Sequence, residues 1–306
     1  MIVSETKDTR KDATAGLGYG VLAYLIWGFF PVYFKALTAV PPLQVVSHRI
    51  VWSLLFLSLI LGWRGKWSVV TEAFRDRRVV LLLISSALLI ATNWLVFIIA
   101  VGHSQVIQSS LGYFITPFVS VLLGVIFLKE RLSRLQIISL ILAAAGVVLL
   151  TVQYGRFPWV SLILAFTFGS YGLLRKVVTV DSITGLTVET LLLSPFALGY
   201  LVYVALNGTG SFPGQLLQTD VFLVFAGVAT SVPLLLFASA ARRLRLATIG
   251  FLQYITPTIQ FLLAVLLYKE PFTQAHLTCF LLIWSGLCCY SYDAVRRIRK
   301  RPDAPE

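Results

Sequence analysis

The sequence predicts an all-α integral membrane protein with ten transmembrane helices, arranged as two inverted repeats of five helices with both termini in the cytoplasm. Three observations lead to this fold class: an apolar composition, ten apolar segments of spanning length, and an internal repeat with a period of five segments. Of the 306 residues, 58% are hydrophobic and 12% are charged, and the mean hydropathy is +0.87. A soluble domain holds about 25% charged residues, because its surface faces water. The composition therefore indicates a chain whose exterior is apolar as well.

The net charge of +12 comes from basic residues that cluster between the apolar segments. In a soluble protein this charge would favour nucleic acid as a partner, but here it is typical of loops that face the cytoplasm. We expect a small-molecule substrate and the lipid bilayer as partners, and no nucleic acid. The three cysteines, Cys279, Cys288 and Cys289, share one apolar segment without the spacing of paired metal ligands, so we expect no metal and no cofactor.

A spanning helix needs about 20 apolar residues. Cutting the chain at charges and at Pro/Gly clusters predicts spans at 15–35, 43–62, 79–100, 106–128, 135–153, 158–175, 184–206, 220–241, 247–268 and 274–294. The expected organisation is a cytoplasmic tail (1–14), a first repeat (15–153), a second repeat (158–294) and a basic cytoplasmic tail (295–306). No cleavage site follows the first apolar run, so we expect it to be an uncleaved span.

The distribution of Lys and Arg sets the orientation. Of the 25 such residues, 21 fall on the side of the N-terminus, three fall on the other side, and Arg49 lies within a span. Because basic loops stay in the cytoplasm, this ratio places both termini there and predicts a multi-pass protein of the inner (plasma) membrane. The basic loop 64–78 carries apolar residues at helical spacing, which favours a helix on the inner membrane surface over a solvated loop.

The chain contains the same segment twice. "ITPFVSVLLGVIFLKE" (115–130) and "ITPTIQFLLAVLLYKE" (255–270) share eight of sixteen residues at an offset of 140, and Gly28 matches Gly169 at 141. A period of five spans inverts the second copy in the bilayer, as in many secondary transporters that work by alternating access. Pro117 and Pro257 each free a backbone carbonyl within a span, which indicates either a wet cavity or a structural kink.

Three charged or readily titratable residues lie well inside predicted spans. Arg49 is expected to face a central cavity and to attract a substrate carboxylate or Glu189, although an arginine at this depth can also extend to the outer headgroups. Glu189 is the acidic residue furthest inside a span, and His48 matches it at the offset of 141. Both are candidates for proton coupling. The alternatives are a Glu189 side chain that extends to the inner membrane surface and a His48 that is an ordinary hydrogen-bonded interior histidine.

Further mid-span side chains add hydrogen-bonding and aromatic surface, and each is a candidate for the substrate pathway or for ordinary packing. They are Trp27, Asn93, Trp94, Tyr113, Gln253 and Tyr254.

Several segments also carry a resemblance to a known family. They are "AYLIWGFFPVYFK", "HRIVWSLLFL", "NWLVFIIAVG", "SLGYFITPFVSVLLGVIFLKERL" and "LRLATIGFLQYITPTIQFLLAVLLYKE". From about Leu17 to Asp293 the chain resembles the RarD branch of the EamA group, in the drug/metabolite transporter superfamily. The resemblance implies two inverted five-helix halves around a central cavity, with the fifth and tenth helices peripheral. The family is associated by name with chloramphenicol sensitivity, and the resemblance supplies no physiological substrate.

The resulting functional hypothesis is a secondary transporter of small metabolites or drugs, working as an exporter. The chain lacks a G-x-x-x-x-G-K-[ST] phosphate loop, so it is not expected to use ATP itself. A membrane-embedded enzyme is the first alternative, but no span carries H-E-x-x-H, G-x-S-x-G or a carboxylate pair. A channel or sensor is the second alternative.

Overall fold

The computed structural model describes residues 2–102, 106–154, 159–214 and 216–267, together with residue 274 and short stretches between 277 and 293. Throughout these residues the secondary structure is helical, without strands. Residues 103–105, the Lys269–Glu270 pair, the tail 295–306 and parts of the predicted tenth span lie outside the described residues.

The first repeat holds seven helices. They are α1 (Ile2–Gly28), α2 (Phe30–Lys35), α3 (Pro42–Arg64), α4 (Trp67–Ala73), α5 (Arg77–Gly102), α6 (Val106–Leu128) and α7 (Arg134–Tyr154). The second repeat begins with α8 (Trp159–Val177), α9 (Ser182–Leu206), α10 (Leu217–Arg243), α11 (Leu246–Leu252) and α12 (Ile255–Leu262), followed by a π-helical turn at Leu263–Leu267. Within the described residues, six helices are long and apolar enough to cross a membrane.

Two predicted spans are interrupted. The span 15–35 breaks at Phe29 into α1 and α2, and Pro31, which has no N–H to donate, lies in the first turn of α2. The span 247–268 breaks at Gln253 and Tyr254, where Pro257 cannot donate the helical hydrogen bond to the Gln253 carbonyl. Helix α1 also starts at Ile2, so the predicted tail 1–14 continues the first helix.

The predicted helix in loop 64–78 is present as α4. Its Val70 and Ala73 are buried in a cluster with residues of α5 and α9, whereas Trp67 and Phe74 are exposed. One part of the apolar face of α4 therefore packs against the protein, and another part is exposed.

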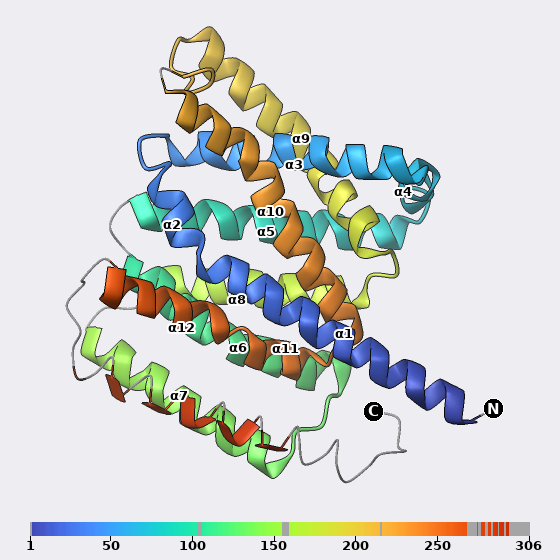
Figure 1. Cartoon of the computed structure of the whole chain (residues 1–306), viewed down its shortest axis with the longest axis vertical. Helices are drawn as coiled ribbons and strands as arrows, with labels where there is room; N and C mark the ends of the chain where they lie inside the picture. Colours follow the sequence, from blue (N-terminus) through green and yellow to red (C-terminus); the bar gives the residue numbers. More distant parts are fainter. Residues whose placement is uncertain are drawn as a thin grey trace.

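The helix packing obeys the inverted repeat. Helix α1 packs against α10 and α12, and its counterpart α8 packs against α5 and α6; α3 packs against its own counterpart α9. Figure 1 shows α3, α5, α8 and α6 as successive layers. Helix α7 lies at the edge of this stack, which is the peripheral position expected for the fifth helix.

A matched pair of glycines allows close helix approaches. A Cβ on Gly28 of α1 would lie 2.7 Å from Ile259 of α12, and a Cβ on Gly169 of α8 would lie 2.8 Å from Val119 of α6. Gly28 matches Gly169 and Val119 matches Ile259 at the repeat offsets, so the same contact is made twice. Each repeat thus uses its first helix to close against the fourth helix of the other.

Candidate functional site

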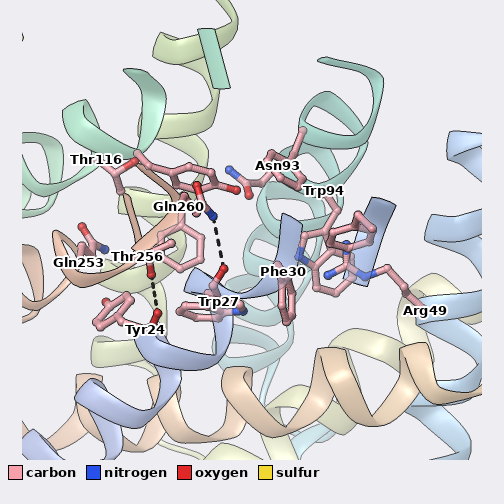
Figure 2. Close-up of a pocket in the computed structure, with 14 residues that line it drawn as sticks. Tyr24, Trp27, Phe30, Arg49, Asn93, Trp94, Thr116, Gln253, Thr256 and Gln260 are labelled. Carbon is pink, nitrogen blue, oxygen red and sulfur yellow. Dashed lines mark hydrogen bonds between the residues drawn. The ribbon is translucent and has the colours of Figure 1, made fainter. Parts of the chain in front are cut away.

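A central pocket lies between the two repeats and holds about 640 Å³ of space free of atoms, including its opening. Figure 2 shows its labelled lining side chains converging from helices of both repeats. The lining residues are Tyr24, Trp27, Phe30, Phe34, Arg49, Asn93, Trp94, Phe97, Tyr113, Thr116, Phe168, Gln253, Thr256 and Gln260.

Three repeat-related pairs line the pocket. Tyr113 matches Gln253 and Thr116 matches Thr256 at the offset of 140, and Trp27 matches Phe168 at 141. The two threonines both donate to main-chain carbonyls, Thr116 to Gly112 at 2.8 Å and Thr256 to Tyr24 at 2.9 Å. The pocket wall is therefore built from equivalent positions of the two inverted halves.

Six of the nine pathway residues expected from the sequence line this pocket, namely Trp27, Arg49, Asn93, Trp94, Tyr113 and Gln253. His48, Glu189 and Tyr254 do not line it. The repeat itself was the signal that could have added Phe168, from Trp27, and both threonines of the I-T-P motifs. Phe30, Phe34 and Phe97 carried no such signal, because aromatic residues are common in spans.

Arg49 of α3 is 4% exposed. Its Nε donates to Thr230 Oγ1 of α10 at 2.9 Å, and its guanidinium carbon lies 4.6 Å from the Trp94 ring centroid and 5.2 Å from that of Phe34. Cation–π contacts of this kind favour a buried positive charge. Among the described residues Arg49 forms no ion pair. The side chain thus presents an uncompensated charge to the pocket instead of extending to the outer headgroups.

Glu189 has a different environment from the one expected. It is 1% exposed on α9 and forms an ion pair with Arg175 Nη1 at 3.3 Å, while Ser86 donates to it at 2.5 Å and Tyr171 at 3.4 Å. The expected pairing of Glu189 with Arg49 is absent. Arg175 is the last residue of the predicted span 158–175 and was counted among the basic residues of the cytoplasmic side, but it is fully buried near the end of α8.

The backbone around this ion pair is adapted to it. Arg175 Nη2 donates to the Ser182 carbonyl at 3.2 Å, and a Cβ on Gly185 would lie 2.0 Å from Arg175 Nη1. Only glycine leaves room for the guanidinium at this point of α9. Asp181 caps the same helix by accepting from Thr184 N at 2.9 Å. Burial alone would raise the pKa of the Asp181 carboxyl, but the hydrogen bonds from Thr184 outweigh this effect and lower the pKa below its usual value.

His48 lies outside the pocket although it precedes Arg49 in sequence. It is 5% exposed, its Nδ1 accepts from Trp52 Nε1 at 3.2 Å, and its ring centroid lies 5.2 Å from that of Phe212. Adjacent residues of a helix point in directions about 100° apart, since a turn holds 3.6 residues. His48 therefore faces the 207–214 segment while Arg49 faces the pocket.

The amide groups of the pocket are oriented by the protein. Asn93 Nδ2 donates to the Leu164 carbonyl at 3.0 Å and to Thr167 Oγ1 at 2.9 Å. Gln260 Nε2 donates to the Trp27 carbonyl at 3.3 Å, and Gln253 Oε1 accepts from Ser120 at 3.2 Å. The Tyr24 hydroxyl is buried and makes no hydrogen bond within the described part of the chain.

A second cluster joins the repeats beyond the C-terminal end of α6. Lys129 adopts a left-handed conformation with φ 54°, which turns Glu130 back against Gly124. The Glu130 carboxylate, 8% exposed, accepts from the backbone N–H groups of Leu246 at 2.7 Å and Ala247 at 3.0 Å. A carboxylate of the first repeat thus holds the N-terminus of α11 in the second repeat, where the helix dipole favours negative charge.

Comparisons with known proteins agree with this architecture. The model of the EamA-like transporter family matches residues 14–152 and again 158–292, so it covers each repeat once. An uncharacterized transporter from Vibrio cholerae is 44% identical over 94% of this chain and 95% of its own length. "Protein RarD" from Salmonella typhi is 41% identical over 97% of this chain and all of its own length, and that from Escherichia coli is 40% identical over 97% and 99%.

A crystal structure with 19% sequence identity superposes with a TM-score of 0.68 over 92% of this chain and 98% of its own, which shows a shared fold. The family match over both repeats and the relatives above 40% identity over nearly the full chain confirm the resemblance found in the sequence. The chain belongs to the EamA-like transporter family, in its RarD branch, and is a multi-pass membrane transporter of small molecules.

Proposed function

We propose that this protein is a secondary transporter of the inner membrane that exports a small organic molecule by alternating access. The observation that carries the proposal is the central pocket, whose wall uses equivalent residues of both inverted repeats, such as Thr116 with Thr256 and Trp27 with Phe168. In such an arrangement the two halves can exchange conformations around one fixed site. Ten spans with both termini inside are part of this proposal.

The position of the pocket supports an outward-facing state. Arg49, Asn93, Trp94 and Tyr113 all lie on the halves of their helices that the Lys and Arg distribution places toward the outside. The opposite side is joined across the repeats by the Glu130 contacts with α11. In the proposed cycle these contacts close the cytoplasmic side and break when the pocket turns inward.

The repeat assigns a counterpart to this closure. At the offset of 140, Glu270 corresponds to Glu130, and Val106 and Ile107 correspond to Leu246 and Ala247. Alternating access through inverted repeats exchanges the roles of such pairs, so Glu270 is the residue proposed to serve the outer closure. Glu270 lies outside the described residues, and the assignment rests on the sequence alone.

We further propose that transport is coupled to protons through Glu189. Within the spans of the described chain it is a buried carboxylate bound to Arg175, Ser86 and Tyr171. Protonation removes its charge and breaks the ion pair, which frees α8 from α9. Intramembrane carboxylates commonly serve as proton relays. An inward proton gradient would then drive export by exchange.

The test is flux in proteoliposomes that contain the purified full-length protein, with and without an imposed pH gradient. The panel consists of aromatic organic anions, their neutral and cationic analogues, and chloramphenicol. Saturable flux of at least one compound, absent from protein-free liposomes, is the expected result. Enzymatic conversion without flux, or non-saturable conductance, would overturn the proposal. Flux indifferent to the gradient would remove proton coupling alone.

A further inference from the structure

The pocket lining carries a positive charge and no negative one. Of its fourteen lining residues, Arg49 is the only Lys, Arg, His, Asp or Glu. A buried guanidinium without a counter-ion is costly, because its lost hydration is not replaced. In the described part of the chain no carboxylate forms an ion pair with Arg49, and the buried Glu189 is already paired with Arg175. The missing counter-ion is therefore expected from the ligand.

The orientation of Arg49 defines where this anion binds. Thr230 holds Nε, and the rings of Trp94 and Phe34 flank the guanidinium. The two terminal nitrogens make no hydrogen bond to any described residue, and their fork matches the two oxygens of a carboxylate. The wall next to Arg49 is aromatic, which favours a flat ring attached to the anionic group.

The far end of the pocket is polar but neutral. Figure 2 shows Arg49 at one end of the labelled residues and Tyr24 with Gln253 at the other, with Trp27 and Phe30 between them. The Tyr24 hydroxyl is buried, and no described residue completes a hydrogen bond with it, although the Gln253 side chain lies nearby. A ligand hydroxyl or carbonyl at this end would satisfy it, since an unpaired buried polar group is unfavourable.

From these three features we propose that the pocket binds an organic monoanion with an aromatic body and a neutral polar group at the opposite end. Its carboxylate pairs with Arg49, its ring lies along Trp27 and Phe30, and its polar group meets Tyr24. An ammonium group has no carboxylate to bind in the pocket wall, so the expected order of affinity is anion, then neutral molecule, then cation. This inference names the substrate class of the proposed transport function and rests on it.

The experiment measures equilibrium binding to the purified full-length protein in detergent by calorimetry. The probes are 4-hydroxyphenylacetate, its amide 4-hydroxyphenylacetamide and the amine tyramine, which share one ring and one hydroxyl. We expect 4-hydroxyphenylacetate to bind about 10- to 100-fold more tightly than the amide, since a hydrogen bond to a charged group is worth about 1.5–3 kcal/mol. Tyramine is expected to bind most weakly. Equal affinities, a preference for tyramine, or no binding of any probe would overturn the proposal.

Three variants at two positions assign the preference to residues. Arg49→Ala should remove the difference between acid and amide, and Arg49→Lys should restore part of it, because lysine keeps the charge without the fork. Tyr24→Phe should weaken the binding of 4-hydroxyphenylacetate several-fold but leave the affinity for phenylacetate unchanged. Cyclohexylacetate, which has the same charge without the aromatic ring, should bind more weakly than phenylacetate. An acid preference that persists in Arg49→Ala would contradict the assignment.

Binding and flux together separate this inference from the transport function. Preferential binding of the anion without flux in proteoliposomes would support the pocket chemistry and count against the proposed transport. Flux of the amide and of tyramine at the rate of the acid would support transport and count against the anion preference.

Discussion

The second helices of the two repeats, α3 and α9, hold charged residues at nearly equivalent positions but in opposite situations. Arg49 of α3 lies at the pocket without a described counter-ion, whereas Glu189 of α9 lies behind the pocket and is neutralised by Arg175. At the offset of 141 the residue matching Glu189 is His48, and the one matching Arg49 is Thr190. The repeat therefore reproduces the backbone and the helix contacts, whereas the charged residues of the two halves have different environments.

The fourth helices differ in a second way. Helix α6 runs without interruption through Pro117, whereas its counterpart is divided into α11 and α12 at Gln253 and Tyr254. Thr116 and Thr256 nevertheless keep equivalent positions in the pocket. Of the two fourth helices, the one in the second repeat is therefore the one that is interrupted, beside the polar end of the pocket.

The largest expected effect comes from removing one partner of the neutralised pair. Arg175→Ala leaves Glu189 buried without its counter-ion and should reduce stability by about 3–5 kcal/mol. Arg49→Ala, which also removes a buried arginine but from the other half, should leave stability nearly unchanged because it breaks no described ion pair. Thermal unfolding in detergent measures both. Equal losses of stability would remove the distinction between the two arginines.

A smaller effect is expected at the glycine that accommodates the pair. Gly185→Ala places a methyl group against the Arg175 guanidinium and should cost about 1–3 kcal/mol of stability. Gly199→Ala in the same helix is the control, because nothing lies within 4 Å of its added Cβ. If both variants unfold at the same temperature, the close contact between α9 and Arg175 is wrong.

Weakening the contact between Glu130 and α11, which we propose to close the cytoplasmic side, should change the conformation with little change in stability. Glu130→Gln removes a charge that faces the N-terminus of α11 and should weaken its two hydrogen bonds. Labelling from the cytoplasmic side of a cysteine that replaces Ala247, which is buried on α11, should then become several-fold faster. Glu270→Gln is the matched variant and should not accelerate this labelling. Unchanged labelling in Glu130→Gln would mean that the contact is not part of the closure.

The smallest expected effect is at the cap of α9. Asp181→Ala should lower stability by about 1 kcal/mol at neutral pH. Because the hydrogen bonds lower the pKa of Asp181 in the folded protein, its contribution is present above the ordinary aspartate pKa and is lost as the pH falls through the lowered value. The variant and the parent should therefore converge in stability at acidic pH. A difference that grows on acidification would contradict this sign.

Much of the fold could be predicted from the sequence. Apolar length places nine of the predicted spans within helical segments to a few residues, because burying a backbone in lipid requires its hydrogen bonds to be satisfied internally. The breaks at Phe29 and Gln253 were missed, since apolar length gives no sign of where a helix divides. The proline positions were visible, but Pro117 shows that proline alone does not divide a helix.

The candidate site was predicted in part. Polar residues within apolar spans indicated Arg49, Asn93 and Gln253 correctly as pocket residues, because such groups are costly away from water or protein. The environment of Glu189 was not predictable by the same reasoning. Arg175 stands at the end of an apolar segment and counts as a loop residue in any tally of basic side chains. Only the folded arrangement, which brings the end of α8 to Glu189 of α9, makes it a buried partner.

The most direct test of the account compares ligand affinity in Arg49→Ala and Glu189→Gln, measured per folded protein with 4-hydroxyphenylacetate. The account predicts that Arg49→Ala binds about 10- to 100-fold more weakly, while Glu189→Gln keeps its affinity and loses the dependence of flux on the pH gradient. Loss of affinity in Glu189→Gln, with normal binding in Arg49→Ala, would contradict the central claim that Arg49 is the charge that meets the substrate.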